Sequence, residues 1–121
     1  MVFVIYYSTY GHVAKLASSI VAGVERAGCN CRVFRVAETL SDEVLAKMHA
    51  PPKNMDVPVI RPDQLSEADG FLFGMPTRFG TAPAQIKALF DACSSHWHSD
   101  ALIGKPVYFL SFLFIIVYSL Y

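Results

Sequence analysis

The chain has 121 residues, enough for one domain with a hydrophobic core but not for two. Because 54% of the residues are hydrophobic and only 17% are charged, the composition argues against intrinsic disorder. Ten basic residues balance ten acidic ones, which argues against a basic surface for nucleic acid.

The first third of the chain predicts a strand, a helix and a second strand. Residues 2–7 are continuously apolar, as in a parallel strand covered on both faces. In residues 13–24 apolar side chains recur at spacings of three and four, which predicts one buried stripe of a helix, and Gly28 is a stop signal. Residues 31–36 alternate in part, as at a sheet edge.

The middle of the chain is less regular. Residues 41–48 predict a short helix capped by Ser41. Prolines then interrupt any long element up to residue 62, and residues 63–69 predict one or two helical turns. Residues 70–74 predict a second buried strand.

The last part predicts another helix and strand. Pro83 suits the first turn of a helix whose apolar face is formed by Ile86, Leu89, Phe90 and Cys93. Residues 107–112 predict a third buried strand. Strands that alternate with helices indicate an α/β fold, a single domain over residues 1–121 with a doubly wound parallel sheet.

Several classes of site are not supported. The three cysteines, Cys29, Cys31 and Cys93, match no disulfide or zinc spacing, and the N-terminus does not resemble a signal peptide, so we expect an intracellular, cytoplasmic protein. His96 and His98 lack a third ligand, so no metal site is predicted. No acid, base or nucleophile is predicted to be catalytic.

Two polar loops follow the first and second buried strands. Ligands of doubly wound sheets bind beyond the carboxyl ends of the strands, where the strand order reverses. At Ser8 to Val13, free amides at a helix start and the hydroxyls of Ser8 and Thr9 would hold a phosphate, and Gly11 would allow close approach. The alternative is that Ser8 or Thr9 only caps the helix.

Other nucleotide-binding motifs do not fit. A dinucleotide-binding loop needs three glycines where only Gly11 occurs, and "IGKP" departs from a Walker loop. Thr77, Arg78 and Phe79 offer a hydroxyl, a cation and an aromatic surface, while Trp97 is either a ligand contact or a packing residue. A ligand with a phosphate at the first loop and an aromatic ring near the second matches flavin mononucleotide (FMN).

The stretches "YYSTYGHVAKLA" and "GMPTRFG" resemble the signatures of the WrbA-type NAD(P)H:quinone oxidoreductases, a flavodoxin-like family. "VAETL", "APPK", "ADGFLFG" and "HW" before "LIGKP" also match, so the resemblance covers residues 1–106. It implies a flavodoxin-like fold, FMN and NAD(P)H as cofactors, and two-electron reduction of quinones to hydroquinones.

The resemblance also implies roles for particular residues. The FMN-phosphate loop corresponds to Ser8, Thr9, Tyr10, Gly11, His12 and Val13, and the segment along the flavin ring to Thr77, Arg78 and Phe79. Tyr10 also matches a residue that meets the nicotinamide cofactor. Trp97 matches an aromatic residue near the quinone pocket, although Ser94 and Ser95 replace two glycines and His96 replaces an apolar residue.

The resemblance stops after Pro106. The family continues with a polar loop around the flavin ring, a fifth strand and a last helix, whereas residues 107–121 form a divergent, uncharged hydrophobic tail. We therefore expect a C-terminally truncated fold, an exposed apolar sheet edge and weakened FMN binding. The alternative function is a catalytically impaired relative that acts as a binding protein. The family forms homotetramers, which we do not expect for this chain, and the tail would be an alternative weak membrane anchor.

Overall fold

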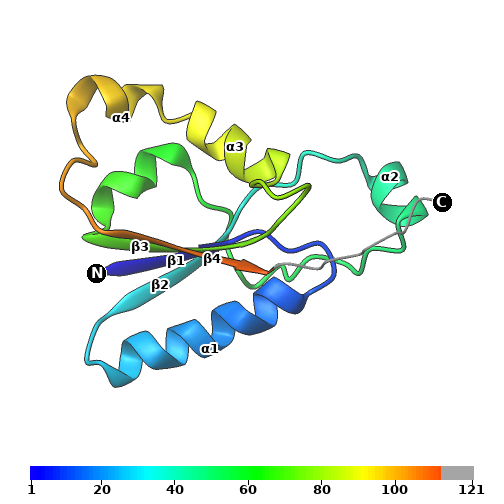
Figure 1. Ribbon diagram of the computed structural model, residues 1–121, viewed down its shortest axis with the longest axis horizontal. Coiled ribbons are helices and arrows are strands. Elements are labelled where there is room, and N and C mark those ends of the chain that lie inside the picture. The colour runs from blue at the N-terminus through cyan, green and yellow to red at the C-terminus, as the bar shows by residue number, and fades with distance from the viewer. Residues whose placement is uncertain (113–121) are drawn as a thin grey trace.

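The computed structural model describes residues 1–112 and consists of a parallel sheet flanked by helices (Figure 1). In chain order the elements are β1 (Val2–Tyr6), α1 (His12–Arg26), β2 (Cys31–Arg35), α2 (Asp42–Lys47), the 3-10 helix η1 (Pro62–Glu67), β3 (Gly70–Pro76), α3 (Ala84–Asp91), α4 (Ser94–Ser99) and β4 (Val107–Phe112). The predicted α/β class is confirmed. The predicted membrane anchor falls largely on residues 113–121, which lie outside the described residues.

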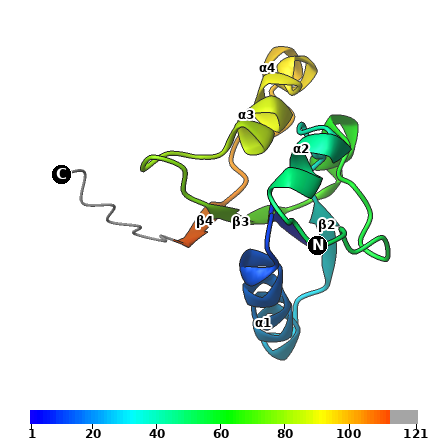
Figure 2. The same ribbon diagram turned by 90° about the vertical axis from the view of Figure 1, so that its right-hand side faces the viewer.

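Helices lie on both faces of the sheet, as the doubly wound prediction requires. Helix α1 lies against one face, and η1 and α3 lie on the other, with α4 beyond α3 (Figures 1 and 2). Each face has its own hydrophobic cluster: one includes Leu65 and Ile86, and the other includes Val13 and Ala17. Helix α2 lies apart, beyond the carboxyl ends of the strands (Figure 1).

Strand β1 is the centre of the core because it is covered on both faces. Its side chains alternate between the two clusters: Phe3 and Ile5 join one, and Val4 and Tyr6 join the other. Phe3, Val4 and Ile5 have no exposed surface. The continuous apolar run of this strand therefore has the predicted cause, which is coverage on two sides.

The strand order is β2-β1-β3-β4, and all neighbours are parallel. The chain moves from β1 to β2 on one side and then crosses to β3 on the other side of β1. This reversal separates the loops that follow β1 and β3, and it creates the crevice in which ligands of such sheets bind. The partly alternating β2 is an edge strand, as predicted.

Strand β4 is not the buried strand that the sequence predicts. It pairs with β3 and is the last strand of the sheet within residues 1–112, and Val107, Tyr108 and Phe109 are 44%, 67% and 57% exposed. Phe109 stacks on Phe73, with ring centroids 5.4 Å apart, and meets Phe90 edge-on at 6.4 Å. The apolar composition of residues 107–112 correctly predicted a strand, but composition alone does not show whether a helix covers that strand.

The predicted helix after Pro83 is divided. Helix α3 ends at Asp91, and Cys93 is the N-cap of α4 while its side chain packs against the core. The short elements of the middle segment follow the prediction more closely. Ser41 caps α2 by accepting a hydrogen bond from the Val44 amide. None of the helices in residues 1–112 is long and apolar enough to cross a bilayer.

Candidate functional site

The loop after β1 is shaped by Ser8 and Gly11. The Gly11 amide donates to Ser8 Oγ at 3.0 Å, and Gly11 has a φ of 92°, a left-handed conformation that glycine adopts without strain. Gly11 is the N-cap of α1, and no side chain caps this helix. The helix-capping alternative for Ser8 and Thr9 is therefore wrong. Since Ser8 Oγ accepts this bond, its own O–H can still be donated to a ligand.

The first turn of α1 leaves amide groups open at the crevice. The first hydrogen bond of the helix runs from the Lys15 amide to the Gly11 carbonyl at 3.0 Å. The amides of Val13 and Ala14 precede it, so they have no acceptor within the helix. Such amides carry the positive end of the helix dipole, which favours an anion.

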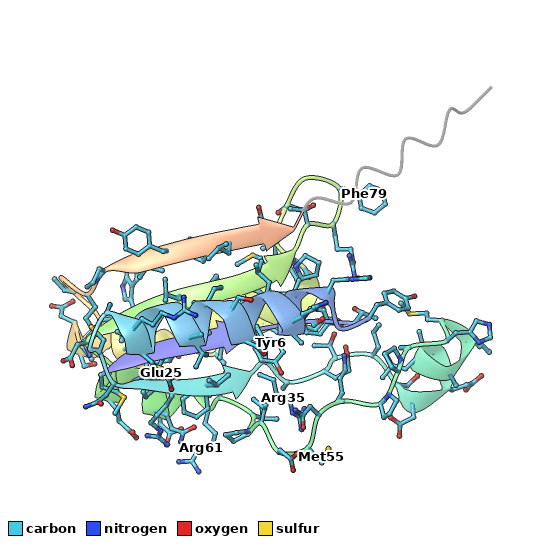
Figure 3. All side chains as sticks on the ribbon, turned by 90° about the horizontal axis from the view of Figure 1, so that it is seen from below. Tyr6, Glu25, Arg35, Met55, Arg61 and Phe79 are labelled. Carbon is cyan, nitrogen blue, oxygen red and sulfur yellow. The ribbon has the colours of Figure 1, made fainter. Side chains whose placement is uncertain are left out.

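The loop after β3 forms a tight hairpin with an aromatic tip. Arg78 and Thr81 pair through two backbone hydrogen bonds of 2.9 and 3.1 Å, and both residues between them, Phe79 and Gly80, have positive φ, as in a type I′ turn. Phe79 is fully exposed and points away from the protein (Figure 3). The hairpin therefore presents a flat apolar ring to the surroundings at the carboxyl end of β3.

A hydrogen bond joins the two loops. Arg78 Nη2 donates to Thr9 Oγ1 at 3.3 Å, although these residues are 69 positions apart. Thr9 is buried, and its hydroxyl donates to the Tyr7 hydroxyl at 3.3 Å. The Thr9 side chain thus fixes the loop, while its backbone amide remains for a ligand. Tyr10 is half exposed and donates from its hydroxyl to the Met48 carbonyl at 3.0 Å, which anchors the loop to the end of α2.

The structure brings together most of the predicted site residues. Those gathered at the carboxyl edge of β1 and β3 are Ser8, Thr9, Tyr10, Gly11, His12, Val13, Thr77, Arg78 and Phe79. His12 is the first residue of α1. Their donors are amides, a hydroxyl and a guanidinium, which suits the phosphate of FMN, and the Phe79 ring suits its flat ring system.

Trp97 lies elsewhere. It is on α4, is 84% exposed, and α4 is at the opposite end of the molecule from the two loops (Figure 1). It lines an open groove of about 780 Å³ together with Phe90, Leu102 and Ile103.

Neighbouring His96 contacts the Pro62 carbonyl through Nε2 at 2.5 Å. Groups of three metal-ligating side chains do not occur within residues 1–112.

Sequence reasoning missed a polar cluster behind the first loop. It is centred on the Glu38 carboxylate, which accepts from the Tyr7 hydroxyl and from Gln85 and pairs with Lys53. Burial by itself would raise the pKa of Glu38, but hydrogen bonds from Lys53, the Leu40 amide, Gln85 and Tyr7 outweigh it and lower this pKa to about 2. Burial raises the pKa of Tyr7. These residues are far apart in the sequence, so no local spacing could reveal them.

The sheet order, the amide-lined loop after β1 and the aromatic hairpin after β3 define a flavodoxin-like protein. Two solved structures share this fold. A WrbA-like flavodoxin from Agrobacterium tumefaciens has a TM-score of 0.62 at 25% identity and matches 91% of this chain and 57% of its own. Megasphaera elsdenii flavodoxin has a TM-score of 0.61 at 21% identity, over 92% of this chain and 64% of its own, and shows the fold alone.

The sequence profile of the family described as NADPH-dependent FMN reductase matches residues 2–114, and the chain belongs to this family. Quinone-oxidoreductase QR2 of Triphysaria versicolor is 57% identical over 106 residues, which are 87% of this chain and 51% of that protein. NAD(P)H quinone oxidoreductase YCP4 of Candida albicans is 50% identical over 103 residues, 85% of this chain and 36% of that protein. The chain thus spans about half the length, or less, of these curated relatives, and the resemblance inferred from its motifs is confirmed.

Proposed function

We propose that the chain binds FMN across the two loops and acts as an NAD(P)H-dependent quinone reductase. The observation that carries the proposal is the Arg78–Thr9 hydrogen bond, which holds the amide-lined loop and the aromatic hairpin at one edge of the sheet. The family description and the names of the relatives QR2 and YCP4 support the same chemistry.

In this proposal each loop has one task. Within residues 8–13, the amides that remain open and the Ser8 hydroxyl hold the phosphate, and Gly11 keeps the backbone close to it. Thr77, Arg78 and Phe79 lie along the flavin ring, and Tyr10 meets the nicotinamide cofactor. The resemblance implies a quinone contact for Trp97, but this residue lies at the opposite end of the molecule from both loops, so it is left out of the proposal.

Bound FMN would supply the redox chemistry, passing two electrons as a hydride from NAD(P)H to a quinone, which would become the hydroquinone on taking up one proton from solvent. The contribution of this chain is binding and orientation. The open amides attract the phosphate dianion, and the hairpin limits where a flat ring can lie. We assign no side chain a proton-transfer role.

The test is a titration of the purified chain with FMN, followed by quenching of flavin fluorescence, with riboflavin as the matched ligand that lacks the phosphate. We expect saturable binding of FMN and at least tenfold weaker binding of riboflavin, because the phosphate contacts are worth more than one hydrogen bond to a charged group. NADPH-dependent reduction of a soluble benzoquinone then tests turnover. Equal affinity for the two flavins would contradict the phosphate site.

A second candidate function is FMN binding without quinone reduction. The position of Trp97 favours it, since this residue lies at the opposite end of the molecule from the flavin loops. In that case the protein would be yellow and would bind FMN, yet added NADPH and quinone would give no turnover. Reduction of quinone by NADPH in the presence of the FMN-loaded chain would reject this second candidate.

A further inference from the structure

The Glu38 carboxylate is the meeting point of four segments behind the first loop. It follows β2 in sequence, and its side chain is only 14% exposed. Around it are the end of β1 (Tyr7), the segment after α2 (Lys53) and the first turn of α3 (Gln85). The carboxylate lies on the protein side of the loop, so it is not itself a ligand of an anion in the crevice.

Every polar neighbour of this carboxylate is a donor. Oε1 accepts from the amides of Thr39 and Leu40 at 3.0 and 3.2 Å and from Gln85 Nε2 at 2.9 Å. Oε2 pairs with Lys53 Nζ at 3.0 Å, and the Tyr7 hydroxyl lies 3.2 and 3.0 Å from the two oxygens. An ionised carboxylate satisfies all of them because it only accepts. A glutamine in its place would direct its own N–H groups at donors.

Two arms connect this carboxylate to the loop. In the first arm, Lys53 Nζ also donates to the Ser8 carbonyl at 2.8 Å. Because the carbonyl and the following N–H of a trans peptide point in opposite directions, this bond turns the Thr9 amide away from Lys53.

The second arm is a chain of hydrogen bonds. Arg78 Nη2 donates to Thr9 Oγ1, Thr9 Oγ1 donates to the Tyr7 hydroxyl, and the Tyr7 hydroxyl donates to Glu38. The chain has a cation at one end and a carboxylate at the other, and such chains strengthen each of their bonds.

We propose that Glu38 is a positioning residue for the anion site. It orients the Ser8–Thr9 peptide through Lys53, and it holds Thr9 and Arg78 through Tyr7. This inference rests on the proposed function, since it specifies how the same loop is held in a phosphate-binding geometry. It assigns to Glu38 a larger effect on the phosphate half of the ligand than on the ring half, which Glu38 reaches only through the chain of hydrogen bonds to Arg78.

The signature is therefore the ratio of FMN affinity to riboflavin affinity. In Glu38→Gln we expect this ratio to fall at least tenfold, the equivalent of one charge-assisted hydrogen bond, while riboflavin affinity changes less than twofold. Tyr7→Phe removes only the second arm, and we expect a fall of about threefold. A variant that merely lost its fold would lose both ligands together.

The matched control is Glu43→Gln, because Glu43 also pairs with a lysine, Lys47 at 2.7 Å, but is exposed on α2. We expect it to keep the ratio of the parent chain. Circular dichroism and thermal unfolding are recorded for each variant. If Glu38→Gln is unfolded, the ratio of FMN affinity to riboflavin affinity in Tyr7→Phe tests the inference instead. The inference is overturned if the folded variant keeps the parent ratio within twofold. A parent chain that does not prefer FMN to riboflavin would instead overturn the proposed function.

Discussion

Phe79 has a backbone conformation that residues with large side chains rarely adopt. Its φ is 52°, in the left-handed region, and its ring is fully exposed, so no packing within residues 1–112 compensates for the strain. Strain of this kind costs about 1–2 kcal/mol and concentrates at functional sites. A contact with a ligand would account for an exposed aromatic ring at this strained position.

The strain and the ligand contact can be separated by Phe79→Asn. Asparagine adopts positive φ more readily, so we expect the free energy of unfolding to rise by about 0.5–1 kcal/mol in urea titrations. The loss of the ring should weaken FMN binding about two- to tenfold, the range of an aromatic contact. Phe79→Tyr, which keeps both ring and strain, should match the parent in both measurements. Unchanged FMN affinity in Phe79→Asn would remove Phe79 from the site.

Glu38 also makes stability depend on pH. Its pKa of about 2 in the folded chain lies below its ordinary value of 4.5, so the unfolded chain takes up the proton first as the pH falls. The stability that Glu38 contributes is complete above pH 5 and is lost progressively between about pH 4.5 and pH 2. We expect the parent to lose about 2 kcal/mol more than Glu38→Gln between pH 6 and pH 3, measured by urea unfolding. Glu43→Gln should follow the parent, and parallel curves for parent and Glu38→Gln would contradict the assignment.

At the scale of elements, α1 approaches the sheet at Gly74. A β-carbon at this position would lie 3.1 Å from Val13 Cγ1 and 3.4 Å from Tyr6 Cβ, so the absence of a side chain allows the first turn of α1 to rest on β3. Val13 is buried and, as a β-branched residue in a helix, has little rotamer freedom. The height of the helix start above the sheet, and with it the position of the open amides, depends on this contact.

Gly74→Ala should therefore destabilise the chain by about 1–3 kcal/mol through overpacking, and it should weaken FMN binding as the helix start moves. Val13→Ala removes the atom that the new methyl group meets, so the double variant should lose at least about 1 kcal/mol less than the sum of the single losses. Gly23→Ala, inside α1 with open space around it, is the control and should stabilise by about 0.5–1 kcal/mol. If the loss of unfolding free energy in the double variant equals the sum of the two single losses in urea titrations, Val13 is not the residue that the new methyl group displaces.

How much of this could be predicted from the sequence depends on whether the cause is local. The continuous apolar run of β1, the stripe on α1 and the Ser41 cap are local patterns, and each is confirmed. The exposure of the β4 side chains depends on distant packing, so the prediction of a buried strand was wrong, although the exposed apolar sheet edge that was also predicted occurs within residues 1–112. The two loops were found by their motifs. The Glu38 cluster was not, because its members meet only in the folded chain.

At the scale of the whole molecule, coverage of the sheet is uneven. Helix α1 contacts β1, β2 and β3, whereas Tyr108 and Phe109 on β4 remain exposed. Strand β4 has no charged residue, and within residues 1–112 its outer edge has no partner strand. An uncharged apolar edge is a template for pairing with another chain, and the neutral overall charge does little to oppose association.

Tyr108→Lys should therefore reduce concentration-dependent association, because a lysine on an edge strand opposes pairing with a second edge. Tyr108 suits the test because it is 67% exposed, so a lysine there is expected to leave the core and the flavin loops intact. Static light scattering over a range of protein concentrations should show a lower apparent mass for this variant than for the parent. Ser19→Lys adds the same charge on the exposed side of α1 and controls for net charge. If both variants reduce the association equally, its cause is the overall charge. If Tyr108→Lys does not reduce it, the β4 edge is not the site of association.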